Sequence, residues 1–365
     1  MRIIAVVGDM GGAEELIPVV GELEKSGHHR AQWVVCPSPQ AKAGDKLGKA
    51  NIPFERRLPQ SQDADADLIL IGTSATAAEA QIAFTEFVCY DDTPVVWFED
   101  LYGTGSTDKV RGVSPDLMLT IDSIAAGIAK RVRPELQVIP VGKPSFTALA
   151  PKIQEKLVIR QKLIESCGLA PDPFVVTCVL GSKGLTEHID ALKGLPSEIN
   201  GRLTTLVLRL HPKLPEADRK AALDSALEAS HLRITIAPNI PTDEAVIAAD
   251  VSLNGPGSTE QYKSVLAGVP ACVLMFPDTD RLRKELSEKG YLNGKTPLVY
   301  AGAGIEITNS GELLNVLKDC VHPACQTIMS RDAQPFGQLL DPNAAAVAAR
   351  EILGFCEQFK YQPMD

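Results

Sequence analysis

The sequence predicts an α/β protein with two doubly wound domains, each built on a parallel sheet. Short apolar runs alternate with amphipathic stretches of helical length along most of the chain. The runs are apolar at successive positions, which is typical of strands covered by helices on both faces and hence of parallel sheets. The alternation pauses once and then restarts, and 365 residues are enough for two domains with separate cores.

The first half contains six predicted strands, with helices at 14–26 and 75–86 among the connections. The strands are expected at 2–7, 31–36, 68–71, 94–98, 117–120 and 136–141. The sequence Val-Gly-Lys-Pro at 141–144 predicts the end of the last strand and a turn.

The second half restarts after an amphipathic helix at 153–167 and a proline-containing connector at 169–173. Its strands are expected at 174–180, 204–210, 233–236, 249–253 and 271–275. The sequence Asp-Pro-Asn at 341–343 caps a final alanine-rich helix that continues to 353. We therefore expect a first domain at 1–150 and a second at 151–340. A C-terminal helix within 341–365 can pack back on the first domain.

Charge and hydropathy exclude several classes of function. The net charge is −10 and no run of lysine and arginine occurs, which argues against sequence-independent binding to nucleic acid. No segment reaches the roughly 18 apolar residues that a membrane helix needs. The apolar N-terminal run ends at Gly8 and is too short for a signal peptide. We expect a cytoplasmic protein without an integral membrane segment.

The eight cysteines are expected to be buried free thiols rather than metal ligands or disulfides. Cys36, Cys89, Cys178 and Cys272 lie in or beside apolar runs. The C-x4-C pair near position 320 is by itself a weak metal signal. We therefore expect no metal site.

A glycine-rich loop follows the first strand and opens the first helix. It contains Asp9, Gly11 and Gly12. Glycine lets backbone amides approach a ligand, and a helix N-terminus favours anions. The spacing is not that of a dinucleotide-binding loop. The alternative is a tight turn in which Asp9 or Glu14 caps the helix.

Two loops of the second half suit a diphosphate. One follows the strand at 174–180, and the other opens a short helix near 260. Glycine amides, hydroxyls and an ammonium group can surround phosphate, although neither loop has the P-loop spacing. A plain turn is the alternative in both cases. The candidate nucleotide- and phosphate-binding residues are Gly181, Ser182, Lys183, Gly257, Ser258, Thr259, Glu260 and Gln261.

Two other strand ends have side chains suited to acid–base chemistry. His211 follows the strand at 204–210 and can bond a phosphate or move a proton. Glu99 and Asp100 follow the strand at 94–98. Adjacent strand residues point to opposite faces, so we expect one of the two carboxylates to face a ligand. The alternatives are a structural histidine and a solvated strand end.

In this order, the loops resemble those of the GT-B superfamily of nucleotide-sugar enzymes, over nearly the whole chain. The MurG-like glycosyltransferases have G-G-T-G-G-H, G-G-S-Q-G and S-G-x-x-T-x-x-E…G-x-P, to which residues 8–13, 180–184 and 255–270 are similar. The non-hydrolysing UDP-N-acetylglucosamine 2-epimerases have G-D-T-x-T and H-V-E-A-G, to which residues 72–76 and 97–101 are similar. The resemblance implies two Rossmann-like domains facing a cleft, the GT-B fold.

The sequence departs from the transferase pattern at two positions. The N-terminal histidine that those enzymes are thought to use as a base falls on Ala13, so Glu14 or Asp9 would have to replace it. The carboxylate that holds the donor ribose falls on Lys263, with Glu260 one helical turn earlier.

The epimerase pattern loses two of its main acids. The aspartate of G-D-T is Thr73, and the paired glutamates fall on Tyr262 and Lys263. Hydroxyl and ammonium groups do not replace carboxylates in proton transfer at neutral pH. Of the epimerase residues considered, Glu99 and His211 are retained.

The resemblance implies a glycosyltransferase-like protein that uses a nucleotide-activated sugar, foremost a UDP-sugar, without a metal or other cofactor. Lys183 and His211 would stabilise the leaving diphosphate. Glu99 or Glu14 would act as the base on the acceptor side. The alternatives are an epimerase-like or nucleotide-sugar-hydrolysing enzyme and a non-catalytic binding protein of the same fold. The sequence leaves the acceptor and the oligomeric state open, a homodimer included.

Overall fold

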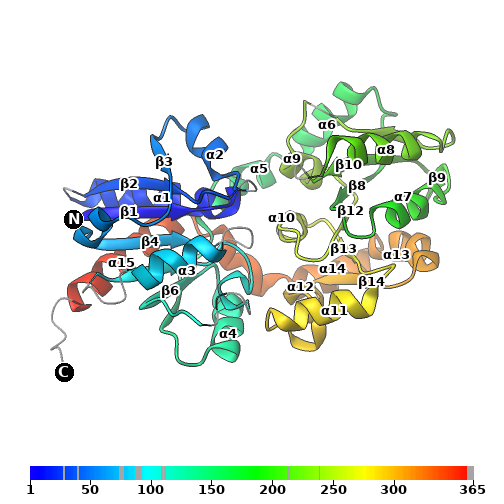
Figure 1. The fold of residues 1–365 in the computed structure, drawn as a ribbon. Helices are drawn as coiled ribbons and strands as arrows, with labels where there is room; N and C mark the ends of the chain where they lie inside the picture. Colours follow the sequence, from blue (N-terminus) through cyan, green and yellow to red (C-terminus); the bar gives the residue numbers. More distant parts are fainter. Residues whose placement is uncertain are drawn as a thin grey trace. The chain divides into compact units, whose positions relative to one another are not determined.

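The computed structural model describes residues 1–27, 29–38, 41–73, 78–87, 93–107, 110, 112–211, 214–237 and 239–359. The chain divides into two compact units (Figure 1). The first unit comprises residues 1–147, 288–291 and 338–365, and the second comprises residues 148–287 and 292–337. The segment from Gln338 onward thus returns to the first unit.

The first unit has a seven-stranded parallel sheet in the order β3-β2-β1-β4-β5-β6-β7. The order reverses between β1 and β4, so the loops that leave these two strands flank the topological switch point of the sheet. The strands are β1 (Arg2–Val7), β2 (Arg30–Val35), β3 (Phe54–Arg56), β4 (Leu68–Gly72), β5 (Val95–Phe98), β6 (Leu117–Thr120) and β7 (Val138–Pro140).

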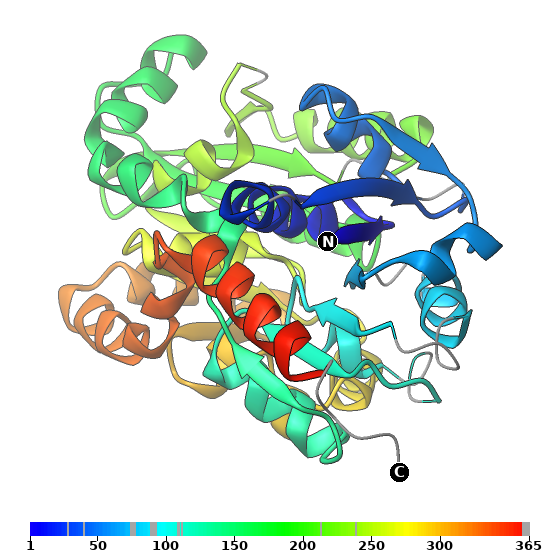
Figure 2. The ribbon, with the colours of Figure 1, turned by 90° about the vertical axis from the view of Figure 1, so that its left-hand side faces the viewer.

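Helices cover this sheet and bury its apolar strands. Helix α1 packs against α15, and Figure 2 shows the two side by side. Short 3-10 helices lie at Ser61–Asp65, Thr104–Ser106 and Pro144–Phe146. The α-helices are α1 (Met10–Ser26), α2 (Ala43–Lys49), α3 (Ala78–Phe87), α4 (Ser123–Val132) and α15 (Ala344–Phe359).

The second unit has a parallel sheet in the order β11-β10-β8-β12-β13-β14, with β9 antiparallel to β10. The chain first builds outward from β8 to β10 and β11, and then returns to the other side of β8 with β12. The switch point therefore lies between β8 and β12. The strands are β8 (Phe174–Leu180), β9 (Glu198–Ile199), β10 (Arg202–Leu210), β11 (Arg233–Thr235), β12 (Val251–Asn254), β13 (Ala271–Leu274) and β14 (Gly304–Ile307).

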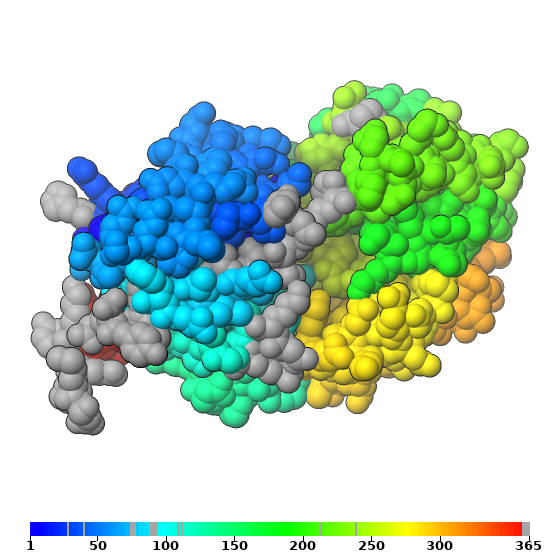
Figure 3. All heavy atoms as spheres, in the orientation of Figure 1, coloured from blue at the N-terminus to red at the C-terminus, as the bar shows by residue number. Residues whose placement is uncertain are grey.

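The helices of the second unit enclose a core of aliphatic side chains from β8, β10, β12 and β13. Helices α7, α8 and α11 make up much of the face of this unit that Figure 3 shows. Short 3-10 helices lie at Leu292–Gly294, Ser310–Glu312 and Gln334–Leu340. The α-helices are α5 (Leu149–Gln154), α6 (Lys156–Cys167), α7 (Leu185–Lys193), α8 (Glu216–Leu227), α9 (Thr242–Ile247), α10 (Glu260–Leu266), α11 (Thr279–Glu288), α12 (Pro297–Tyr300), α13 (Leu313–Cys320) and α14 (Pro323–Asp332).

The prediction of two parallel-sheet α/β domains is confirmed. Two predicted helices differ from the structure in their bounds. Helix α1 begins at Met10 rather than at 14, because Gly11 and Gly12 form its first turn. The single helix expected at 153–167 is two helices, α5 and α6, which meet at Glu155.

The sequence analysis does not predict β3 and β14. All three side chains of β3 are exposed, and β14 is only half-buried along most of its length. Both are edge strands, so neither contains the continuous apolar run that identifies a strand in the middle of the sheet.

The described cysteines are free, and five of them are buried, among them Cys36, Cys178 and Cys272. Cys89 lies outside the described residues, as do 75–77 of the predicted helix at 75–86. Over the part of the chain that the structure describes, no helix is long and apolar enough to cross a bilayer.

The first turn of α1 packs closely against the backbone at the end of β4. A Cβ atom added at Gly72 would lie 2.9 Å from Cα of Gly12, and one added at Gly12 would lie 3.2 Å from the Gly72 and Thr73 backbone. The first turn of α1 can approach the sheet this closely because neither Gly12 nor Gly72 has a side chain.

We predict that Gly72→Ala lowers the stability of the protein by about 1–3 kcal/mol, because α1 must shift away from β4. Gly21→Ala, also on α1, is the control. A Cβ at Gly21 meets nothing within 4 Å, so this change should stabilise by about 0.5–1 kcal/mol through helix propensity. Urea unfolding followed by circular dichroism measures both changes. An unchanged midpoint for Gly72→Ala would show that the close approach is not required.

Candidate functional site

Three of the loops singled out in the sequence lie together at the carboxyl edge of the second sheet. β8 lies between β10 and β12. The His211 amide donates to the Leu180 carbonyl oxygen at 2.9 Å, and the Gly255 amide donates to that of Val179 at 3.2 Å. The loops after β8, β10 and β12 are therefore neighbours at the switch point, where open α/β sheets bind ligands.

The loop after β12 is open on its outer side. Added Cβ atoms at Gly255 and Gly257 would meet nothing within 4 Å, and Gly257 has a φ of +81°. Ser258 Oγ accepts a hydrogen bond from the Glu260 amide at 3.3 Å, and the Ser258 carbonyl oxygen accepts one from Gln261 Nε2 at 2.9 Å. Hydrogen bonds within the loop thus stabilise its conformation, and there is space beside its backbone.

Three buried acceptor atoms, at the end of β12 and the start of α10, lack a hydrogen-bond partner among the described residues. They are Asn254 Oδ1, Glu260 Oε2 and Gln261 Oε1. Asn254 and Gln261 are fully buried, and the other Glu260 oxygen pairs with Lys263 Nζ at 2.7 Å. Buried acceptors are almost always satisfied in folded proteins, so each of these three atoms has capacity for a further hydrogen bond.

The loop after β8 offers a hydroxyl and an ammonium group. Ser182 and Lys183 are exposed, and Lys183 forms an ion pair with Glu285 of α11. Gly184 starts α7 with a φ of +65°, and an added Cβ would lie 2.7 Å from Pro277 Cδ. Gly184 is therefore explained by packing, whereas a Cβ at Gly181 would meet nothing within 4 Å.

His211 is exposed at the end of β10, and Pro212 lies outside the described residues. The neighbouring Arg209 has a structural role. Its guanidinium donates to the carbonyl oxygens of Ile236 at 2.7 Å and of Ala237 at 3.0 Å.

In the first unit, Glu99 and Asp100 occupy different environments at the end of β5. Glu99 is fully buried. One of its carboxyl oxygens accepts from the Gly105 amide at 3.1 Å, and the other has no partner among the described residues. Burial raises the pKa of Glu99 well above its ordinary value, and the charges of Asp100 and Asp122 add to this effect. The environment therefore favours the neutral, protonated carboxyl.

Asp100 is partly exposed and faces the glycine-rich loop. Burial raises its pKa from 3.8 to about 6, against the lowering effects of the Lys143 charge and a Thr104 hydrogen bond. Its Oδ1 accepts from the Thr104 hydroxyl at 3.0 Å and from the Thr73 hydroxyl at 3.2 Å. A Cβ at Gly11 would lie 2.3 Å from Asp100 Oδ2, so this glycine makes room for the carboxylate.

The other residues of the first loop differ in what they contact. Asp9 is at the N-cap position of α1 without a side-chain capping hydrogen bond. Glu14 is half-exposed and pairs with Lys46 of α2 at 2.8 Å. The backbone contact with β4 explains Gly12. Of the segment 72–76, only Gly72 and Thr73 lie among the described residues.

The sequence analysis misses a buried ion pair that adjoins Asp100. Lys143 Nζ lies 2.6 Å from Glu15 Oε1 and donates to the backbone oxygen of Asp100 at 2.5 Å. Ser145 donates to both Glu15 oxygens, through its hydroxyl at 2.6 Å and its amide at 2.9 Å. The available signal was the position of Glu15 on the buried stripe of α1, beside Leu16 and Gly12.

Metal binding has no structural indication in the described residues, where no group of three or more histidine, cysteine, aspartate or glutamate side chains could hold an ion.

Several solved structures are similar to the whole chain. The UDP-GlcNAc 2-epimerase of Neisseria meningitidis bound to UDP-GlcNAc matches with a TM-score of 0.62 at 14% identity, over 97% of this chain and 100% of that one. MnaA of S. aureus with UDP matches with a TM-score of 0.67 at 15% identity, over 100% and 99%. MurG of Acinetobacter baumannii matches with a TM-score of 0.55 at 15% identity, over 97% and 99%. The chain has the GT-B fold.

No protein-family model matches the chain, and no curated protein matches its sequence. At these identities the GT-B likeness concerns the fold. It agrees with the fold that the ordered loops imply in the sequence.

We predict that Asp100 makes the protein less stable as the pH rises from about 4 to about 6. The folded protein holds the Asp100 proton more tightly than the unfolded chain does, because its pKa rises from 3.8 to about 6 on folding. The stability that Asp100 contributes is therefore fully present below its pKa in the unfolded chain, and it is lost above its pKa in the folded protein. Compared with wild type, Asp100→Asn should gain stability over this interval.

Urea unfolding at a series of pH values measures the difference. Asp45→Asn, which changes an exposed carboxylate on α2, is the control and should follow the wild-type profile. A constant difference between wild type and Asp100→Asn from pH 4 to pH 7 would contradict the assignment.

Proposed function

We propose that this GT-B protein binds a nucleotide-activated sugar, foremost a UDP-sugar, and acts as a metal-independent glycosyltransferase. The observation that carries the proposal is the cluster of unsatisfied acceptors on Asn254, Glu260 and Gln261, beside two open glycine loops at the switch point. Ribose and sugar hydroxyls are the donors that such acceptors need, and loop amides with an ammonium group suit the diphosphate. The UDP-GlcNAc in the Neisseria structure and the UDP in the S. aureus structure support the same ligand class.

The nucleotide half of the site is assigned to the second unit. The residues proposed to hold the diphosphate are Gly181, Ser182, Lys183, Gly257, Ser258 and Thr259. Glu260 and Gln261 would accept hydrogen bonds from the ribose. Lys183 must leave Glu285 to reach a phosphate, and this exchange replaces one half-exposed ion pair by another at little cost.

The leaving diphosphate would be stabilised by Lys183 and His211, so that no cofactor is needed. The acid–base groups would come from the first unit. Asp100, partly exposed with a pKa of about 6, suits a base near neutral pH. Glu14 and Asp9 are the other candidates for this role. Glu99 is proposed as a proton donor, because its environment favours the protonated form. The cytoplasmic location remains a prediction.

One observation favours 2-epimerase-like chemistry as a second candidate. Burial raises the pKa values of both Glu99 and Asp100, and two neighbouring carboxyls in different environments can serve as acid and base. Exposure of the protein to UDP-GlcNAc separates the two candidates. Inversion at C2 of the sugar, seen by NMR, indicates the epimerase, whereas transfer to an acceptor with release of UDP indicates the transferase.

We expect UDP or a related nucleotide to raise the melting temperature of the protein by a few degrees, since a ligand at about 100 times its Kd adds about 2.7 kcal/mol. The panel is UDP, CMP, CDP, GDP, dTDP and UDP-GlcNAc. Glu260→Gln should weaken binding of the active nucleotide about tenfold, because it removes a charged acceptor. Glu228→Gln, an exposed change at the end of α8, is the control. If no nucleotide shifts the melting temperature of the folded protein, the proposal fails.

We expect Asp100→Asn, Glu99→Gln and Glu14→Gln to separate binding from turnover. Each should leave nucleotide affinity within about twofold. Replacement of the group that acts as acid or base should lower turnover about 10²–10⁴-fold. Asp45→Asn is the matched control on the same unit. If all three variants turn over donor at the wild-type rate, these residues are not catalytic. If wild type binds nucleotide without turnover, the protein is a non-catalytic member of the fold.

A further inference from the structure

The second unit has a polar groove of about 440 Å³ at the amino edge of its sheet, opposite the edge proposed to bind nucleotide. Phe174 and Arg202 are the first residues of β8 and β10, and Asp250 directly precedes β12. Lys156 and Arg160 of α6 and Gln326 of α14 line the groove as well. Its volume lies in the range of small-molecule sites, about 300–1,000 Å³.

Positive charge exceeds negative charge in this groove. Both arginines bind the same carboxylate: Arg160 and Arg202 each lie 3.0 Å from Asp250. Arg202 also lies 3.0 Å from Asp172, whose side chain is 74% exposed. Lys156 has no carboxylate partner among the described residues, and its ammonium donates to the Ala267 carbonyl oxygen at 3.1 Å. The lining thus holds three cations and two carboxylates.

Several donors of the groove are not used by the protein. The Lys156 ammonium has three N–H groups, and one of them has a partner among the described residues. Arg202 Nε is buried without a partner. The side-chain amides of Asn200 and Gln326 make no hydrogen bond to a described residue, and both line the groove. Burial lowers the pKa of Lys156, with Arg160 adding to this effect and Asp250 opposing it, as expected for a cation that lacks a counter-ion.

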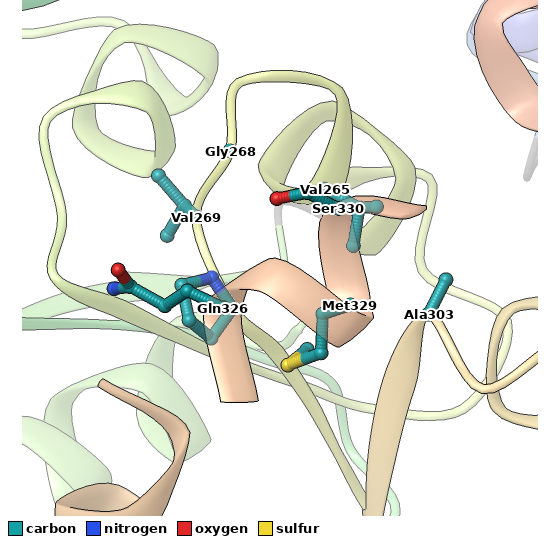
Figure 4. A pocket seen from close by; sticks show the side chains of 8 residues that line it. Val265, Gly268, Val269, Ala303, Gln326, Met329 and Ser330 are labelled. Carbon is teal, nitrogen blue, oxygen red and sulfur yellow. The ribbon is translucent and has the colours of Figure 1, made fainter. Parts of the chain in front are cut away.

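A second hollow of this unit is too small to hold such a ligand. It measures about 10 Å³, roughly the space of one water, and it shares Gly268 and Gln326 with the groove. Figure 4 shows the mostly apolar side chains around it, among them Val265, Val269 and Met329. Of these two hollows, the groove is the one that combines sufficient volume with unsatisfied donors.

We propose that this groove is a second ligand site, distinct from the nucleotide site, which binds a compact polyanion bearing phosphate or carboxylate groups. Lys156 would be its main contact, Asn200 and Gln326 would add amide donors, and the arginine pair would supply a positive field held in place by Asp250. The proposal does not depend on the proposed function, because the groove lies at the other edge of the sheet and uses none of the same residues.

Calorimetric titration of inorganic pyrophosphate and of citrate into the full chain, at constant ionic strength, tests the proposal. We expect at least one of the two to bind. Lys156→Gln should weaken that binding at least about tenfold, because it removes a charge-assisted hydrogen bond, and Lys156→Arg should restore most of it.

Two matched controls remove one lysine charge elsewhere. Lys162→Gln changes the exposed face of the same helix, and Lys220→Gln changes an exposed lysine of α8 that lies outside both proposed sites. Both should leave the affinity within about twofold. The proposal is overturned if neither anion binds at millimolar concentration, if Lys156→Gln leaves the affinity unchanged, or if Lys183→Gln alone abolishes binding. The last result would place the anion at the nucleotide edge.

Discussion

The backbone contact between Gly12 and Gly72 organises the first unit. Because the first turn of α1 lies against the end of β4 with no side chain between them, Gly11 faces the Asp100 carboxylate directly. The same close packing carries Glu15 into the interior, where it meets Lys143. A buried carboxylate is costly without a partner, so the Lys143 ammonium and the Ser145 donors are part of the same constraint. The polar chemistry at this edge thus follows from how closely one helix approaches the sheet.

Glu99 and Asp100 show how one step along a strand changes the chemistry of a carboxyl group. The two residues directly follow β5. Glu99 enters the core, where burial favours its neutral form. Asp100 stays partly exposed among hydroxyl donors and close to the Lys143 charge, which oppose the effect of burial. Neighbouring groups with different proton affinities are what general acid–base chemistry requires. A pair of this kind would suit either of the two proposed reactions, and the residue types alone do not decide between them.

The two edges of the second sheet have opposite hydrogen-bonding needs. At the carboxyl edge, the unsatisfied atoms are acceptors on Asn254, Glu260 and Gln261. At the amino edge, the unused groups are donors, foremost on Lys156. The proposed nucleotide sugar would supply hydroxyl donors to the first edge, and the proposed anion would accept hydrogen bonds from the second. The two proposed sites therefore differ in their chemistry and have no residue in common.

The sequence alone determined the fold class, the central strands and the three loops of the second unit. These follow from local rules: a strand covered on both faces is continuously apolar, and a loop after such a strand reaches the carboxyl edge whatever the rest of the chain does. Only the tertiary structure decided which polar residues are buried together. The pairing of Glu15 with Lys143 joins residues more than a hundred positions apart, and the groove around Asp250 collects side chains from α6, β10 and α14. The edge strands β3 and β14 were also evident only in the tertiary structure. They are defined by pairing with a neighbouring strand and not by an apolar pattern in the sequence. Burial, charge and unsatisfied hydrogen bonds arise from contacts that are distant in sequence, and so no local pattern reports them.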